Sequence, residues 1–299
     1  MLCGWHTRCD LPLRGVEKIV PNSADVDILI EIARGLSPIA KDAGPIVFQH
    51  WSERSLIRIP YAADFEITMG RLIRVWPALG STQKDIEIYL FGPVWASLCH
   101  QRRILPLHAS AILTGNGIAA FAGHAGSGKS SIAASMSLLK YALVADDILP
   151  IGFNRDEVPG AWPYLRRLKL KSDSISQLSL SAIEPVSERL DKTKYFVLPK
   201  YSADNEWGRL YRLYLLEMDP TEMGVAIDQL SGADAVRVLV DQTYHFDFIL
   251  GTRRFGEHLA FCVQLASKIA VYRVRRPPQL VGSRELGLSI QAHLENKSV

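Results

Sequence analysis

Residues 123–131 of this chain read GHAGSGKSS and fit the pattern G-x-x-x-x-G-K-[ST]. The apolar run GIAAFA precedes the motif, and the helix-forming run SSIAASMSLLK overlaps its end and continues beyond it. A glycine-rich turn between a strand and a helix lets successive backbone N–H groups face an anion, and the positive end of the helix points to the same place. The motif therefore predicts an α/β fold in which a phosphate-binding loop joins a buried strand to a helix.

The residue types of this loop point to a nucleotide with its metal ion. We expect Lys129 to reach the β- and γ-phosphates and the Ser130 hydroxyl to bind Mg²⁺, so ATP and Mg²⁺ are the expected cofactors. A turn that only connects a strand to a helix does not need a lysine and a hydroxyl at these positions. The predicted nucleotide-binding residues are Gly123, His124, Ala125, Gly126, Ser127, Gly128, Lys129, Ser130 and Ser131.

Two adjacent carboxylates follow the next apolar run. Asp146 and Asp147 end the segment YALVADD, a predicted strand that comes one helix after the loop. Placing two acids at the end of a buried strand requires a compensating partner, and Mg²⁺ would provide one. In phosphoryl transfer one carboxylate can hold the metal while another accepts the proton of an attacking hydroxyl, and Asp146 and Asp147 are the candidates for these two roles. The alternative is an ordinary turn or helix cap, where aspartates are common.

A predicted hairpin places a histidine beside the loop. Residues 104–114 and 118–122 are two apolar runs around the turn residues Gly115, Asn116 and Gly117, so we expect them to pair antiparallel. Counting outward from either possible turn puts His108 opposite Gly123 or Ala125. The imidazole pKa lies near neutrality, so His108 is a candidate for contact with a phosphate or with the acids. A purely structural strand histidine is the alternative.

The chain is predicted to have two parts. Residues 1–100 are expected to form a β-rich accessory lobe that ends in a helix, in which Thr82 and Asp85 form a capping box and Pro93 causes a kink. Residues 101–299 are expected to form the domain that carries the phosphate loop. The predicted strands of the lobe are PIVFQHW, RSLIRIP and FEITMGRLIRVWP, with Gly70 at a hairpin tip. Later segments are a strand, YRLYLLEM, and the helices GADAVRVLVDQ, GEHLAFCVQLASKIA and SRELGLSIQAHLEN.

Composition excludes several functional classes. The 34 basic residues nearly balance the 31 acidic ones, and no basic patch is interleaved with aromatic residues, so we expect no nucleic-acid partner. The N-terminus lacks the apolar core of a signal peptide and no apolar stretch approaches 18 residues, so we expect a cytoplasmic protein without a membrane partner. The four cysteines form neither a C-x-x-C pair nor a zinc pattern, and we expect buried or idle thiols. A homo-oligomer is left open.

Basic residues outside the motif gather in three segments. YLRRLKLKS alternates leucines with Arg166, Arg167, Lys169 and Lys171, so one strand face offers cations to ATP, to an acidic peptide or to solvent, and a solvated face is the preferred interpretation. The other two segments, GTRRFGEH and YRVRRPPQ, contribute candidates for stabilising a transferred phosphoryl group, although surface positions are the default assumption. These candidates are Arg253, Arg254, Arg273, Arg275 and Arg276.

The segments LHASAI, GHAGSGKSS and LVADD, in this order, resemble the catalytic domain of HPr serine kinase/phosphorylase over roughly residues 104–152. The resemblance implies a P-loop kinase domain with a mixed sheet flanked by helices. It implies an active site of His108, Lys129, Asp146 and Asp147, in which the second aspartate accepts the proton. Ser131 stands where that family commonly has glutamate, and the family's downstream IRGLG-type signature is missing.

The β-rich lobe that leads into LPLHASA makes the chain more similar to the HPr-kinase-like proteins of lasso-peptide biosynthesis. That similarity implies a kinase that transfers the γ-phosphoryl group of ATP to a serine at the C-terminus of a precursor peptide. Three alternatives stay open: a kinase for HPr-like or other proteins, a kinase for a small hydroxylated metabolite, and a nucleotide-responsive binding module without transfer.

Overall fold

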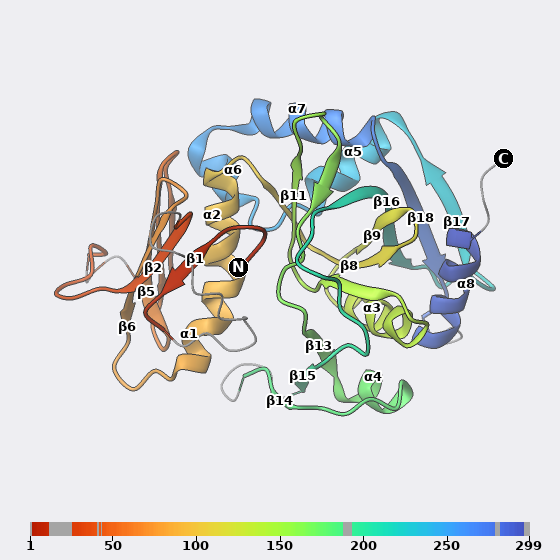
Figure 1. The fold of residues 1–299 in the computed structure, drawn as a ribbon, viewed down its shortest axis with the longest axis horizontal. Coiled ribbons are helices and arrows are strands. Elements are labelled where there is room, and N and C mark those ends of the chain that lie inside the picture. The colour runs from red at the N-terminus through yellow and green to blue at the C-terminus, as the bar shows by residue number, and fades with distance from the viewer. Residues whose placement is uncertain are drawn as a thin grey trace.

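The N-terminal part of the chain forms a six-stranded sheet in the order β1-β2-β6-β5-β4-β3, at the left of Figure 1. The computed structural model describes residues 2–11, 26–40, 42, 44–187, 193–278 and 282–295. The expected hairpin is confirmed, because Thr68 pairs with Leu72 across a tip in which Gly70 has a positive φ. The strands are β1 (Thr7–Cys9), β2 (Ile28–Ile32), β3 (Val47–His50), β4 (Arg54–Ile59), β5 (Ala63–Thr68) and β6 (Leu72–Pro77).

A kinked helical segment connects this sheet to the rest of the chain. It consists of α1 (Gln83–Tyr89), a π-helical turn η1 (Leu90–Val94) and α2 (Trp95–Gln101). The capping box of Thr82 and Asp85 is formed as predicted, and the kink lies at Gly92, directly before Pro93. The fully buried Trp95 belongs to a hydrophobic core that also includes residues of both large sheets. The predicted division near residue 100 thus falls at the end of α2, within a continuous core, and stays a prediction.

The second sheet has a mixed arrangement, in the order β10-β8-β9-β16-β12-β11-β7, with β18 beside β16 and β17 beside β18. The predicted α/β class, a mixed sheet flanked by helices, is confirmed. Its strands are β7 (Leu105–Leu107), β8 (Ala109–Thr114), β9 (Gly117–Ala122), β10 (Ala142–Ala145), β11 (Leu149–Phe153), β12 (Pro159–Ala161), β16 (Gly208–Met218), β17 (Ala226–Leu230) and β18 (Ala270–Arg276).

Helices cover both faces of this sheet because its central strands are apolar on both faces. Along β16, Leu213 and Leu215 belong to one core cluster, whereas Tyr214 and Leu216 belong to another. The first cluster includes residues of α5 (Gly232–Asp241) and α7 (Phe255–Ala266), which lie at the top of Figure 1. The second includes residues of α3 (Lys129–Leu138) and α8 (Ser283–Glu295), at the lower right.

The strand directions bring three segments to one edge of the sheet. Strands β9 and β10 both run antiparallel to β8, so they run parallel to each other. The carboxyl ends of β9 and β10 and the beginning of β8 therefore meet at the same edge. The phosphate loop follows β9, Asp146 and Asp147 follow β10, and His108 directly precedes β8.

Three smaller strands and two short helices complete the described structure: β13 (Leu168–Lys171), β14 (Glu184–Pro185), β15 (Lys194–Val197), α4 (Ser172–Gln177) and α6 (Asp247–Thr252). The small sheet packs at the bottom of Figure 1, beside α4.

One predicted boundary is wrong: the helix expected through Ala270 ends at Ala266, and Ala270 begins β18. Seven residues of β18 pair with the central strand β16, and this pairing outweighs the local helical pattern. All four cysteines have free thiols. Within the described ranges, no helix is long and apolar enough to cross a membrane.

Candidate active site

The loop between β9 and α3 has the backbone shape that the motif predicts. Gly123, Gly126 and Gly128 all have positive φ angles, of 140°, 86° and 103°. At Gly123 a side chain is also excluded by space, because a Cβ atom would lie 2.6 Å from the Leu216 carbonyl oxygen. Gly128 is the N-cap residue of α3, so the first N–H groups of this helix have no capping side chain and face the loop. The segment can therefore bind an anion through its main chain.

Lys129 lies across this loop and is largely buried. Its Nζ donates to the carbonyl oxygens of Gly123, at 2.6 Å, and His124, at 3.2 Å. Burial lowers the pKa of Lys129, although the nearby charges of Asp147 and Asp146 act in the opposite direction. A cation that already sits at the mouth of the loop is placed to contact a bound phosphate.

The predicted nucleotide-binding residues divide between two cavities on either side of His108. A cleft of about 220 Å³ is lined by Ala125, Gly126, Gly128, Lys129, Ser130 and Ser131, together with both aspartates. A second cavity, of about 310 Å³, is lined by Gly123, His124 and Ala125 and by the segment 241–245. Ser127 lines neither cavity: its side chain is buried, and its carbonyl oxygen accepts from Arg276 at 3.3 Å.

Asp146 is buried and held by several donors. Its Oδ1 accepts from the hydroxyls of Ser110, at 2.6 Å, and Ser130, at 2.8 Å, and its Oδ2 accepts from the backbone N–H of Lys169 at 2.8 Å. Burial raises the pKa of Asp146, and the charge of Asp147 adds to this rise against the hydrogen bonds from Ser110 and Lys169. The two predicted metal ligands, Ser130 and Asp146, are thus adjacent.

This donor set fits a magnesium ion that a nucleotide brings with it. Mg²⁺ prefers oxygen ligands and is commonly held by one or two protein groups, water and substrate phosphates. Ser130 and Asp146 supply such oxygens at the edge of the loop. Within the described part of the chain, no group of three histidine, cysteine or acidic side chains is arranged to hold a metal by itself. The phosphates would have to complete the coordination.

Asp147 has a different environment from its neighbour. Its backbone adopts a φ of 78°, and its side chain is about 26% exposed, so the carboxylate faces the cleft. The ammonium of Lys169 lies 2.7 Å from Oδ2, and His108 Nε2 lies 3.9 Å from Oδ1. Burial alone would raise the pKa of Asp147, but the charge and hydrogen bond of Lys169 outweigh it and hold the pKa below its usual value. Asp147 is therefore ionised at neutral pH.

His108 lies where the hairpin register predicts. Ala109 pairs with Ala122 around a turn at Gly115 and Asn116, which places His108 beside Gly123 rather than Ala125. Its backbone N–H donates to the Gln242 carbonyl oxygen at 2.8 Å. Burial, followed by the charge of Lys129, lowers the pKa of His108 to about 4. The imidazole is therefore neutral at pH 7, so one of its ring nitrogens donates a hydrogen bond and the other accepts one.

Three lysines and a serine complete the cleft from the small sheet and α4: Lys169, Lys171, Lys194 and Ser174. For Lys169 the preferred sequence interpretation, a solvated basic face, is wrong, because its ammonium pairs with Asp147. The alternation of leucines and lysines in residues 168–171 indicated that both lysines lie on the same strand face, since Leu168 and Leu170 are buried while the lysines point away. Lys194 gave no sequence signal, because it reaches the cleft only through the pairing of β15 with β13.

The structure separates the candidate arginines. Arg275 pairs with Asp228 and Glu222, and Arg273 pairs with Glu217. Arg276 alone of the C-terminal three reaches the phosphate loop, at the Ser127 carbonyl. The remaining two, Arg253 and Arg254, lie at the start of α7, where Arg254 pairs with Glu257.

Comparisons with known proteins give distant likenesses among solved structures alone. No family model matches the chain, and no curated protein matches it. Among solved structures, the chain is similar to the HPr(Ser) kinase/phosphatase from Coxiella burnetii, with 13% sequence identity and a TM-score of 0.32, over 64% of this chain and 94% of the other.

Proposed function

We propose that this protein is an ATP- and Mg²⁺-dependent kinase that transfers the γ-phosphoryl group to a serine hydroxyl of a peptide. The acceptor proposed on the resemblance of residues 104–152 and of the β-rich lobe is the C-terminal serine of a lasso-peptide precursor. The observation that carries the proposal is that a phosphate loop and two carboxylates with different surroundings line one cleft. The Ser130 hydroxyl donates a hydrogen bond to Asp146 at 2.8 Å, while Asp147 is ionised and lines the same cleft.

The charges of the cleft favour a polyanion. Four lysines line it, Lys129, Lys169, Lys171 and Lys194, against the two aspartates. Backbone N–H groups of the loop and the start of α3 would hold the phosphates, with Lys129 at the β- and γ-phosphates. A magnesium ion held by Ser130 and Asp146 would neutralise charge on the transferred group.

Transfer needs a hydroxyl placed in line with the leaving oxygen and a group that takes its proton. In the proposed reaction, the serine oxygen attacks the γ-phosphorus, and the bond from that phosphorus to the β,γ-bridging oxygen breaks to release ADP. The serine proton passes to the carboxylate of Asp147. His108, neutral and 3.9 Å from Asp147, would orient this carboxylate, and the cavity of about 310 Å³ beyond His108 gives the acceptor room to approach.

The test is phosphoryl transfer to a synthetic peptide. The protein is incubated with ATP, Mg²⁺ and a peptide that ends in serine, and mass spectrometry detects addition of one phosphoryl group. The matched control peptide ends in alanine and should stay unmodified. Asp147→Asn should abolish transfer while ATP binding, measured by calorimetry, persists.

The same assay separates the rival functions. Transfer to other proteins or to small hydroxylated molecules, but not to the peptide, would keep the kinase and replace its acceptor. A third result is that the protein binds ATP but modifies no acceptor, and that the Asp147→Asn variant regulates a partner as well as the wild-type protein does. The protein would then be a nucleotide-responsive binding module. That result would overturn the proposed transfer.

A further inference from the structure

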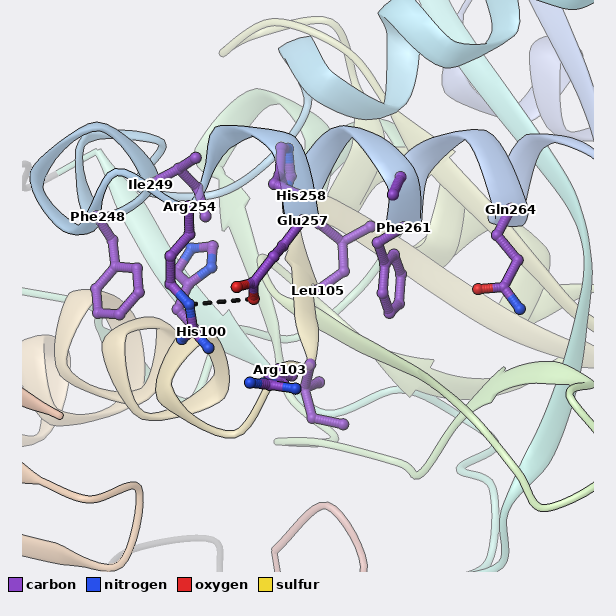
Figure 2. A pocket seen from close by; sticks show the side chains of 12 residues that line it. His100, Arg103, Leu105, Phe248, Ile249, Arg254, Glu257, His258, Phe261 and Gln264 are labelled. Atoms are coloured by element: carbon purple, nitrogen blue, oxygen red, sulfur yellow. Dashed lines mark ion pairs between the residues drawn. The ribbon is translucent and has the colours of Figure 1, made fainter. Parts of the chain in front are cut away.

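A second kind of pocket lies away from the phosphate loop. It has a volume of about 330 Å³ and is enclosed by α7, α6 and the residues that follow α2 (Figure 2). Side chains of α7 point from the helix toward Leu105 and Arg103, and Phe248 closes one end. The volume lies at the small end of the range for ligand pockets, about 300–1,000 Å³, which suits a small molecule rather than a peptide.

Most of the pocket surface is apolar or uncharged. Leu105 and Phe248 are buried in its wall, and the half-buried ring of Phe261 lies over it. His100 stacks on Phe248 with an interplanar angle of 8° and a centroid distance of 4.8 Å. Burial lowers the pKa of His100 to about 3 and also lowers the pKa of His258, so both rings are neutral at pH 7. The walls therefore favour a flat apolar group.

The charged groups of the pocket leave one cation available. Arg254 Nε pairs with the Glu257 carboxylate at 3.3 Å, and a dashed line marks this pair in Figure 2. Arg103 is exposed, lies in the turn that follows α2 and has a φ of 59°. Within the described residues, no carboxylate pairs with Arg103. The lining thus carries two arginines against one acid and favours a ligand with one negative charge.

The pocket wall is hydrogen-bonded to the segment that holds the phosphate loop. His100 Nε2 lies 3.0 Å from the Tyr244 carbonyl oxygen, and His258 Nε2 lies 3.2 Å from Thr243 Oγ1. Gln242, which precedes Thr243 in this segment, accepts a hydrogen bond at Oε1 from the Gly123 N–H at 2.9 Å. Residues 242–244 therefore connect the pocket to the first residue of the loop.

We propose that this pocket is an effector site for a small, flat apolar molecule with a single negative group, which Arg103 binds, and that its occupation strengthens nucleotide binding at the loop. A ligand packed on His100 and His258 stabilises the arrangement of residues 242–244 in which Gly123 is anchored. By linkage, a bound nucleotide must then strengthen ligand binding by the same factor. This coupling rests on the proposed nucleotide site, whereas ligand binding itself does not.

Binding is tested by calorimetry with 2-naphthoate and its neutral analogue 2-naphthamide. We expect the wild-type protein to bind the acid about 10-fold more tightly than the amide, because only the carboxylate of the acid forms an ion pair with Arg103. Arg103→Gln should remove this preference, and Ala260→Trp, which fills the pocket, should abolish binding of both probes. Arg253→Gln is the matched control, because Arg253 is exposed at the start of α7 and does not line the pocket.

Any of four outcomes overturns the site: no binding of 2-naphthoate, equal affinity of the wild-type protein for acid and amide, a preference for the acid that survives in Arg103→Gln, or binding that survives in Ala260→Trp. Circular dichroism of each variant shows that the loss does not come from unfolding. If a variant is unfolded, Gln264→Trp fills the same pocket from the next turn of α7 and replaces Ala260→Trp in the comparison.

Coupling is tested by titrating 2-naphthoate with and without saturating ATP and Mg²⁺. We expect about fivefold or greater tightening with ATP, at the lower end of typical coupling between sites. Equal affinity would refute the effector role and leave a simple binding site. If the wild-type protein binds no ATP, the proposed function and the coupling both fail, while the naphthoate titrations still decide the pocket.

Discussion

Replacing Gly123 with alanine tests whether the loop shape depends on contact with the neighbouring strand. Gly126 offers a matched control in the same loop, because both glycines have positive φ but only Gly123 is crowded. A Cβ atom at position 123 would lie 2.6 Å from the Leu216 carbonyl oxygen and 2.7 Å from Ser127 Oγ, whereas nothing lies within 4 Å of a Cβ atom at Gly126.

The two substitutions share one cost and differ in another. Gly126→Ala forces an alanine into the left-handed region, which costs about 1–2 kcal/mol and is partly offset by the lower entropy of the unfolded chain. Gly123→Ala carries at least this backbone cost, because its φ of 140° lies farther from the left-handed minimum, and it must also displace the Leu216 carbonyl of the central strand β16, which adds about 1–3 kcal/mol by analogy with overpacked cores. We therefore expect Gly123→Ala to lower the free energy of unfolding by about 2–4 kcal/mol in total, clearly more than Gly126→Ala.

Urea denaturation followed by circular dichroism measures both values, with the slope of the transition as a check that the unfolded states are comparable. Equal midpoints for the two variants would refute the reasoning, because only Gly123→Ala has to displace the neighbouring strand. ATP affinity should fall in both variants, since each changes the direction of loop N–H groups.

Three further predictions concern the site. Lys169→Met removes the cation that holds the pKa of Asp147 low, so this pKa should rise. As the pH is lowered, the variant should therefore lose transfer activity at a higher pH than the wild-type protein, and a pH profile of kcat/KM measures the shift. Lys129→Met should weaken ATP binding about 10-fold or more in calorimetry, because a charge-assisted contact to phosphate is lost. Gln242→Met leaves the buried Gly123 N–H without its acceptor and should lower the free energy of unfolding by about 1–3 kcal/mol in urea.

Lys200→Met is the control for Lys169→Met and Lys129→Met, since Lys200 is exposed and does not line the cleft. An unchanged acidic limb in Lys169→Met would mean that another group accepts the proton. Unchanged ATP affinity in Lys129→Met would exclude Lys129 from phosphate binding. Gln242→Leu, which also lacks the amide, should behave like Gln242→Met, and wild-type stability in both would show that Gly123 does not depend on this hydrogen bond.

The parts of the site that could be predicted from the sequence depend on local geometry. The loop motif, the strand before it and the helix after it are contiguous, and a two-residue turn fixes the register that places His108 beside Gly123. The direction of β10 after one crossover helix brings Asp146 and Asp147 to the same edge. Each of these inferences needs only short-range rules of backbone geometry.

The parts that could not be predicted depend on pairings between distant segments. Lys194 reaches the cleft only because β15 pairs with β13, and Gln242 meets Gly123 across more than one hundred residues of sequence. The predicted end of the helix at Ala270 was wrong for the same reason, since pairing of β18 with β16 decides where the strand begins. Periodicity within a segment cannot indicate which distant partner will cover it.

The two aspartates illustrate how neighbouring residues acquire separate roles. Asp146 and Asp147 are identical in type and adjacent, so their sequence alone gives them no ranking. Asp146 is surrounded by three donors in the protein interior, which fixes its position and suits a metal ligand that must not move. Asp147, turned toward the cleft by its positive φ and kept ionised by Lys169, has an oxygen that can face an incoming hydroxyl. The positive φ of Asp147 therefore gives the two carboxylates different surroundings, and this difference follows from backbone geometry rather than from residue type.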